Sequence, residues 1–222
     1  MTAFELRRQT FLIDEVSYDI ESLLDNNQYD AGDDGAVPGI DSATWPVFGQ
    51  VWPASVVMAM NICKLELAGK RVLEIGCGLG LCSIVLHRMG VDITASDYHP
   101  RVREFLDRNV LGNGLLPIKY QTGNWDGENP ELGKFDLIIG SDILYEPDHA
   151  RLVARFIDRH SSDDVQVLIA DPGRSNRANF THNMIGLGYL HRYERFDRDL
   201  QDGNRCRGSI SQYRRESFAA DR

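Results

Sequence analysis

The feature that most constrains the fold is a short apolar run that ends in a glycine-rich turn. Residues 71–75 read RVLEI, and residues 76–80 continue as GCGLG. Such a run indicates a buried strand, and the glycines after it permit the tight backbone path of a strand-to-helix connection. The helix predicted next ends at Gly90, and its apolar face consists of Leu81, Ile84, Val85 and Met89. Strand, turn and helix in this order begin a βα unit of a parallel sheet.

The alternation of apolar strands and amphipathic helices continues to about residue 187. Further buried strands are predicted at residues 91–95, 117–121, 135–140 and 165–170. Residues 189–196 and 205–213 flank a turn-like QDGN and predict an antiparallel pair. The expected fold class is therefore α/β, with a Rossmann-like, seven-stranded sheet. We expect this sheet to be mostly parallel, with a C-terminal antiparallel strand and helices on both faces.

The first 50 residues differ from the rest in composition. Residues 1–24 contain short strand or helix material, and residues 25–44 contain five Asp, three Gly and one Pro but no Lys or Arg. The second stretch is typical of a mobile acidic loop. We therefore expect an N-terminal extension over residues 1–50 and one α/β domain over residues 51–222, which suits the usual size of a single domain.

The net charge indicates which classes of binding partner are electrostatically favoured. The chain carries 24 Lys and Arg against 33 Asp and Glu, a net charge of −9. An acidic surface repels phosphate backbones, so nucleic acid is an unfavourable partner. The same field favours a basic protein segment or a cationic small molecule. The charge does not fix the oligomeric state, for which we expect a monomer or a weak oligomer.

The apolar runs predict where the protein resides in the cell, and the positions of the cysteines and histidines indicate whether it binds a metal. No apolar run approaches the roughly 20 residues that span a bilayer, and the N-terminus does not resemble a signal peptide, so we expect a cytoplasmic protein without membrane attachment. The cysteines form no CxxC pair, and the histidines are too scattered for a metal site, so no metal is expected. We expect reduced thiols and histidines that lie on the surface or in helices.

Residues at the ends of the first two predicted strands indicate a ligand site. In an open α/β sheet, ligands bind beyond the carboxyl ends of the strands. Gly76, Gly78 and Gly80 would let backbone approach a ligand there. Glu74 is placed to hold an ammonium group, directly or through water. Asp97, 23 residues later, can accept both hydroxyls of a ribose.

The glycine spacing separates the possible nucleotide cofactors. A nicotinamide cofactor favours GxGxxG, whose third glycine would fall at position 81, but that residue is Leu81. Gly80 suits S-adenosylmethionine better. A tight turn without any ligand remains the simpler alternative for the glycines taken alone.

Several segments together resemble known methyltransferases. The pattern ExGxGxG at 74–80 with a downstream acid resembles motif I and its successor in class I, seven-β-strand methyltransferases. The chain is similar to methyltransferase family 16, which comprises protein lysine methyltransferases. Three segments carry that similarity: QVWPAS at 50–55, NWD at 124–126 and SDILY at 141–145. DPGR at 171–174 is similar to a segment of the family's electron-transfer-flavoprotein β-subunit lysine methyltransferases.

The resemblance implies S-adenosylmethionine as cofactor, bound by a methyltransferase domain over residues 51–222. It places Trp52 and Trp125 at the border of the cofactor, with Trp125 against adenine, and Gly140 or Ser141 beside it through backbone contacts. Asn124 or Asp126 would cap the adenine amine. Each tryptophan alone fits equally well in the core, because indole brings a large apolar area, and Asn124 could simply terminate a strand.

The resemblance places the methyl acceptor at Asp142 and Tyr145. A lysine acceptor, whose side-chain pKa is ordinarily about 10.4, must lose a proton before it attacks, and a nearby carboxylate opposes that loss. We therefore expect Asp142 to capture and orient the acceptor rather than to act as a base. Tyr145 would accept a hydrogen bond from the amine or stack on the side chain. The alternatives are a turn carboxylate for Asp142 and packing for Tyr145.

The expected function is an S-adenosylmethionine-dependent N-methyltransferase that acts on a protein, most simply at lysine. Arginine is less favoured, because a guanidinium usually requires more than one carboxylate. The enzymatic alternative is a small-molecule amine N-methyltransferase, which requires an enclosed pocket around Asp142 and Tyr145. The non-enzymatic alternative is a methyltransferase-like binding protein that transfers no methyl group.

Overall fold

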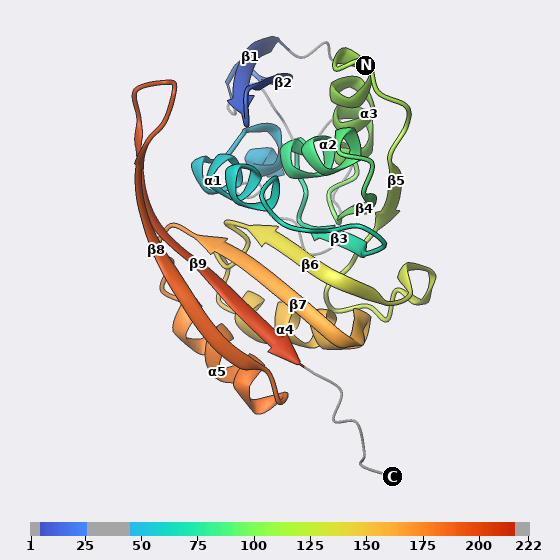
Figure 1. Cartoon of the computed structure of the whole chain (residues 1–222), viewed down its shortest axis with the longest axis vertical. Coiled ribbons are helices and arrows are strands. Elements are labelled where there is room, and N and C mark those ends of the chain that lie inside the picture. The colour runs from blue at the N-terminus through green and yellow to red at the C-terminus, as the bar shows by residue number, and fades with distance from the viewer. Residues whose placement is uncertain (1–4, 26–44, 216–222) are drawn as a thin grey trace.

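A seven-stranded sheet runs through the part of the chain that the computed structural model describes, residues 5–25 and 45–215 (Figure 1). In spatial order its strands are β5 (Lys119–Thr122), β4 (Asp92–Asp97), β3 (Arg71–Ile75), β6 (Phe135–Ser141), β7 (Ser161–Asp171), β9 (Arg205–Arg215) and β8 (Leu190–Asp199). The pairs from β5 to β7 are parallel, whereas β9 is antiparallel to both of its neighbours. The predicted sheet, with its C-terminal antiparallel strand, is confirmed.

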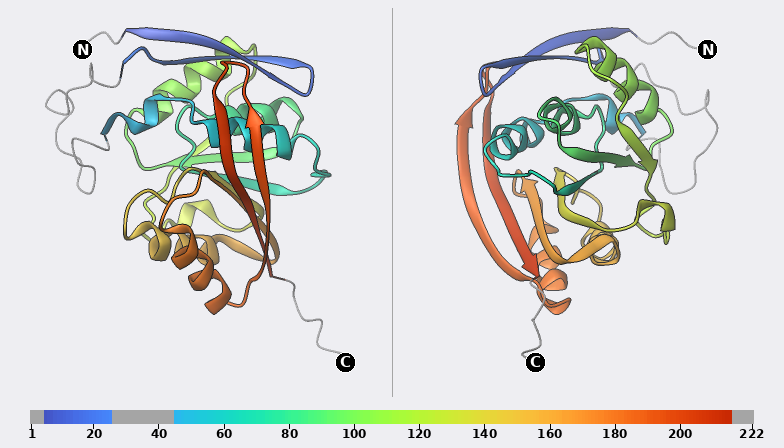
Figure 2. Two further views of the ribbon diagram at one scale, coloured as in Figure 1. Left: turned by 90° about the vertical axis from the view of Figure 1, so that its left-hand side faces the viewer. Right: turned by 45° about the vertical axis from the view of Figure 1, so that its right-hand side comes forward.

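Helices cover both faces of this sheet, as predicted (Figure 2). One apolar cluster contains residues of α1 (Pro53–Ile62), α2 (Leu81–Arg88) and α3 (Val102–Gly112), and the other contains residues of α4 (His149–His160) and α5 (Arg177–Gly186). Strand alternation divides the sheet between them, since Val72 belongs to the first cluster and Leu73 to the second. Both side chains are fully buried.

The N-terminal residues form a separate hairpin of β1 (Leu6–Ile13) and β2 (Val16–Leu23). Two asparagines, Asn109 in α3 and Asn113 directly after it, bind the outer edge of β2. Asn113 accepts from the Asp19 amide at 3.0 Å and donates to its carbonyl at 2.7 Å, while Asn109 makes the equivalent pair with Glu21 at 2.8 and 3.2 Å. The side-chain amides thereby take the place of a neighbouring strand. The predicted acidic loop falls largely outside the described residues.

The C-terminal hairpin of β8 and β9 reaches the N-terminal hairpin (Figure 2). Gln201, in the turn between β8 and β9, accepts from the Leu12 amide at 3.0 Å and donates to its carbonyl at 3.3 Å. Two short 3-10 helices complete the described elements, η3 (Trp45–Gly49) before α1 and η4 (Pro130–Leu132) before β6. None of the described helices is long and apolar enough to cross a membrane.

Candidate functional site

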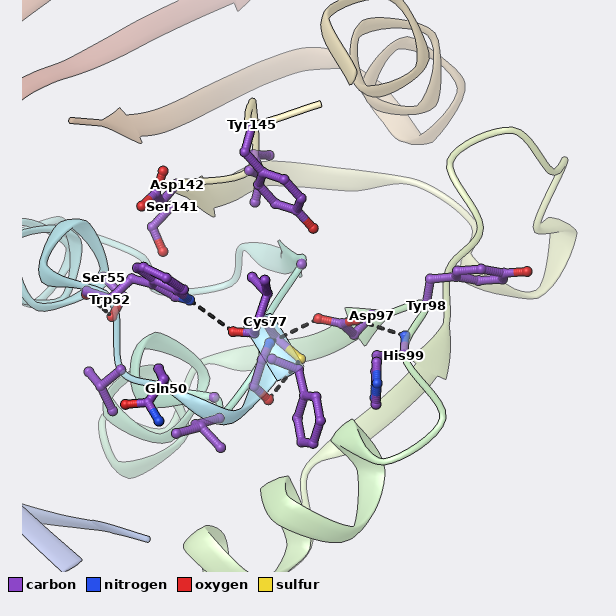
Figure 3. A pocket seen from close by; sticks show the side chains of 18 of the residues that line it. Gln50, Trp52, Ser55, Cys77, Asp97, Tyr98, His99, Ser141, Asp142 and Tyr145 are labelled. Atoms are coloured by element: carbon purple, nitrogen blue, oxygen red, sulfur yellow. Dashed lines mark hydrogen bonds between the residues drawn. The ribbon is translucent and has the colours of Figure 1, made fainter. Parts of the chain in front are cut away.

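A cavity opens at the carboxyl ends of β3, β4 and β6 (Figure 3). The turns after these strands line it, together with Trp125 beyond β5 and residues 47–52 before α1. The cavity is open to solvent, and together with the solvent at its mouth it comprises about 1050 Å³ of space. A hollow at the carboxyl ends of several strands is the place where open α/β sheets bind their ligands.

The glycine-rich turn forms the floor of this cavity and joins β3 to α2. Gly76, Gly78 and Gly80 all have left-handed backbone, with φ of +60°, +51° and +79°. A Cβ on Gly76 would lie 2.8 Å from Ile143 Cγ2, and one on Gly80 would lie 2.3 Å from Leu106 Cδ1. Both the conformation and the packing therefore require glycine. The predicted close approach of backbone to the cavity is present.

Asp97, at the end of β4, holds this turn in place. Its Oδ2 accepts from the Gly78 amide and its Oδ1 from the His99 amide, each at 2.9 Å. Burial raises the pKa of Asp97, and these two bonds oppose the rise. A carboxylate has about four acceptor sites, and the backbone of Gly78, Tyr98 and His99 occupies three of them, so Asp97 retains capacity for a further donor in the cavity. Asp97 lines the cavity at the end of β4, and its binding to a ribose stays a prediction.

Glu74 lies elsewhere than predicted. Its side chain is 3% exposed and does not line the cavity. Its Oε2 accepts from the Ser83 amide at 2.8 Å and from the Ser83 hydroxyl. The reason is strand alternation: Glu74 shares a face with Val72 and so points under α2 instead of toward the strand end. Burial raises the pKa of Glu74 to about 7. Direct contact between Glu74 and a ligand ammonium is not supported.

Two tryptophans, Trp52 and Trp125, line the cavity, and their contact with a cofactor stays a prediction. The indole of Trp52 donates to the Val47 carbonyl at 3.0 Å, which fixes the segment before α1. Trp125 lies against Gly76 and meets the His149 ring edge-to-face at 4.8 Å. Asn124, in contrast, is exposed and does not line the cavity. Its side chain accepts from the Asp126 amide at 3.0 Å, so the structure supports the alternative of a strand-ending turn.

Ser141, Asp142 and Tyr145 lie across the cavity from Asp97 (Figure 3). Asp142 has left-handed backbone with φ of +55°, and its amide donates to the Ala170 carbonyl at 2.9 Å. A non-glycine residue in this conformation is uncommon, and here it directs the side chain sideways from the end of β6. Both Asp142 oxygens bind Arg174, at 2.7 and 3.0 Å. The carboxylate is thus already paired.

Tyr145 contributes an aromatic surface and a neutral hydroxyl. Burial raises the pKa of this phenol, so it stays protonated at neutral pH. Its ring meets the His149 ring edge-to-face at 4.7 Å. The Nδ1 of His149 lies 2.8 Å from the Ile143 carbonyl, and burial lowers the pKa of the imidazole, which is therefore neutral. Neither side chain adds a charge to the cavity.

Several cavity residues were not anticipated from the sequence. Phe48 and His99 stack with ring centroids 4.0 Å apart, and both are buried. His99 was expected on the surface or in a helix, and that expectation was wrong. It lies two residues beyond the strand end at Asp97, so the rule that ligands bind beyond strand ends would have found it. Phe48 precedes the first βα unit, where no periodic pattern marks it.

The residues of the cavity fit S-adenosylmethionine. Glycine backbone without Cβ atoms, a buried carboxylate with free acceptor capacity and a bordering indole match a methionine chain, a ribose diol and an adenine ring, respectively. Within residues 5–25 and 45–215, no group of three or more His, Cys, Asp or Glu side chains is placed to hold a metal ion. All four cysteines carry free thiols.

The strand order, the glycine turn and Asp97 together define a class I, Rossmann-like methyltransferase fold. Among solved structures, the T. thermophilus 16S rRNA N2 G1207 methyltransferase, in complex with AdoMet and guanosine, shares this fold. Its TM-score is 0.61 at 16% sequence identity, covering 97% of this chain and 52% of that chain. The chain belongs to the lysine methyltransferase family, methyltransferase family 16, whose family profile matches residues 41–185.

Curated relatives of the chain carry more than one acceptor in their names. The zebrafish (Danio rerio) protein N-lysine methyltransferase METTL21A is 37% identical, over 54% of this chain and 58% of the relative. The Xenopus laevis electron transfer flavoprotein beta subunit lysine methyltransferase is 30% identical, over 59% and 54%. The Dictyostelium discoideum histidine protein methyltransferase 1 homolog is 31% identical, over 68% and 48%. The chain thus spans about half the length of these relatives.

Proposed function

We propose that this chain is an S-adenosylmethionine-dependent N-methyltransferase that methylates a lysine side chain of a protein. The observation that carries the proposal is that two groups of residues line opposite sides of one cavity. Asp97 and the glycine turn form a cofactor cradle, and Asp142 and Tyr145 stand opposite them. Family membership and the lysine methyltransferases among the relatives support the choice of acceptor.

When bound, S-adenosylmethionine supplies an electrophilic methyl group on a sulfonium. The acceptor nitrogen then forms its bond to the methyl carbon while the carbon–sulfur bond breaks and its electron pair passes to sulfur. The protein contributes chiefly position and electrostatics. Asp97 and the glycine backbone would fix the nucleoside, Trp125 would cover the adenine, and Asp142 and Tyr145 would orient the acceptor nitrogen.

The test is transfer of a labelled methyl group from S-adenosylmethionine into a cell extract, with protein and small molecules separated afterwards. We expect label in protein, at lysine when the labelled protein is digested and analysed by mass spectrometry. The Asp142→Ala variant should abolish transfer, while Asp163→Ala, which removes an exposed carboxylate at the start of β7, should not. Label at histidine or arginine would reject lysine as the acceptor.

Label confined to small molecules would favour the alternative, a small-molecule amine N-methyltransferase. Calorimetric titration with S-adenosylhomocysteine tests the cofactor separately from the acceptor. No binding by a folded sample would defeat the cofactor assignment, whereas binding without any transfer would favour a methyltransferase-like binding protein. A basic segment next to the acceptor, cytoplasmic residence and a monomeric or weakly associated state remain predictions.

A further inference from the structure

The pairing of Asp142 with Arg174 has a direct bearing on the acceptor. The Arg174 Nε donates to Asp142 Oδ1 at 2.7 Å, and its Nη2 donates to Oδ2 at 3.0 Å. The Asp142 side chain is 5% exposed and that of Arg174 is 40% exposed. A two-point pair of this geometry is the strong form of an arginine–carboxylate interaction, and one partner lies inside the protein. The ion pair between Asp142 and Arg174 is therefore a well-ordered part of the site.

The DPGR turn holds Arg174 where it can reach Asp142. The Asp171 Oδ1 accepts from the Gly173 amide at 2.7 Å and from the Arg174 amide at 2.8 Å, which fixes the backbone at the start of the turn. Gly173 has φ of +104°, a conformation that favours glycine. The motif thus sets the direction of a cationic side chain. Nothing in the proposed cofactor cradle requires that direction.

The pair leaves Asp142 able to bind a further donor. Each carboxylate oxygen accepts one hydrogen bond from Arg174 and has capacity for a second. Asp142 also lines the cavity, next to Tyr145. An amine that enters the cavity can therefore donate an N–H to Asp142 while Arg174 stays bound. The effect of Arg174 is on charge: an amine beside Asp142 contacts a neutral ion pair instead of a lone negative carboxylate.

Without Arg174, most charged groups around the place where the acceptor amine would bind, beside Asp142 and Tyr145, are acidic. Five titratable groups act on Asp142, Arg174 or Tyr145, namely Asp97, Glu146, His149, Asp171 and Cys206, and a sixth, Arg177, acts on Asp171 alone. Three of the six are carboxylates, one is an arginine, and the imidazole and thiol are neutral. Such surroundings favour the protonated form of an amine and so oppose its attack on a methyl group. The positive charge of Arg174 offsets the negative charge of Asp142, the carboxylate that the amine would contact.

We propose that Arg174 is a positioning residue that neutralises Asp142, so that the acceptor amine binds beside Asp142 as the free base. This inference rests on the proposed function. The amine gives its proton to solvent on entry, donates a remaining N–H to Asp142 and directs its lone pair at the methyl group. After transfer, the methylated nitrogen releases one further proton to solvent. Asp142 keeps its role in orientation and takes up no proton.

The test compares the pH dependence of kcat in the wild type, Arg174→Gln, Arg174→Lys and Arg177→Gln. The acceptor is the extract protein that the wild type labels, purified and supplied at saturation, because kcat then reports groups in the enzyme–substrate complex. In Arg174→Gln the rising limb should move to higher pH by about one unit or more, the size of a nearby-charge effect. At a fixed pH below the limb, that shift is about a tenfold loss of rate.

The other variants separate charge from structure. Arg174→Lys retains the positive charge, so its limb should stay near that of the wild type even if kcat falls. Arg177, which donates to the Ser209 hydroxyl at 2.5 Å, does not bind Asp142, and Arg177→Gln should leave the limb in place. All variants should bind S-adenosylhomocysteine with unchanged affinity, which also verifies that they fold.

A loss of rate in Arg174→Gln that is equal at every pH would overturn the proposal, and so would equal shifts in the lysine and glutamine variants. If Arg174→Gln fails to bind S-adenosylhomocysteine, the limb of Arg174→Lys decides: a shifted limb despite the retained charge rejects the role of Arg174, and an unshifted one supports it. Absence of protein label with the wild type would defeat the proposed function and this inference together, and is recognised before any variant is made.

Discussion

The buried carboxyl group of Glu74 makes the stability of the fold depend on pH. Burial raises the pKa of Glu74 from 4.5 to about 7. The folded state therefore keeps the proton to a higher pH than the unfolded chain does. The resulting stabilisation is fully present below pH 4.5 and is lost as the pH rises through 7. Between pH 5 and pH 8 the linkage amounts to about 2.5 kcal/mol of unfolding free energy.

The variant Glu74→Gln removes this titration and keeps an oxygen that can accept from Ser83. Near pH 5, where Glu74 is protonated, the variant should match the wild type in free energy of unfolding. At pH 8 it should be more stable by about 2.5 kcal/mol, because the wild type then buries a charge. Asp171 titrates in both proteins and cancels in the difference, whereas Asp97 contributes only through its charge, which raises the pKa of Glu74.

Urea unfolding at pH 5, 6, 7 and 8 measures the difference, with the slope m compared at each pH to verify two-state behaviour. Glu128→Gln, at an exposed position, is the matched control and should parallel the wild type throughout. Parallel curves for the wild type and Glu74→Gln would refute the reasoning, since they would mean that Glu74 is ionised in the folded state over the whole range.

Three further outcomes are expected. Glu74→Gln should bind S-adenosylhomocysteine within about threefold of the wild type, because Glu74 does not line the cavity, and a larger loss in calorimetry would restore it as a ligand contact. Asp97→Ala should weaken the same binding at least tenfold, since one hydrogen bond to a charged group is worth about 1.5–3 kcal/mol, and unchanged affinity would reject the ribose assignment. Gly80→Ala should destabilise the fold by about 2 kcal/mol or more, because its Cβ would lie 2.3 Å from Leu106 Cδ1 at a left-handed φ; an unchanged melting temperature would contradict this.

The parts of the fold that follow a repeating pattern could be predicted from the sequence. Buried parallel strands are apolar runs, and the ends of such strands lie together, so the glycine turn and Asp97 could be placed in one site. Strand boundaries were less certain. The strand predicted at 117–121 lies at Lys119–Thr122, which leaves Pro117, a residue that cannot donate to a ladder, outside it.

Side-chain direction could not be obtained from position along the chain alone. Glu74 follows the alternation of β3 and points under α2, although its place near the strand end suggested a ligand contact. Asn124 turns out of the cavity because the loop after β5 closes on itself. Arg174 reaches Asp142 from 32 residues away. That contact depends on the adjacent ends of β6 and β7 and on the path of one turn, neither of which a local pattern specifies.

The side-chain amides at the two edges of the N-terminal hairpin have a consequence for how the protein is synthesised. Asn109 and Asn113 cover the edge of β2, and Gln201 covers the edge of β1 at Leu12, a contact that spans 189 residues. At 5–20 residues per second, translation reaches Gln201 roughly 10–40 s after Leu12. During that interval part of the β1 edge has no partner from this turn and is open to other strands. The first strand to be made is thus among the last to be completed.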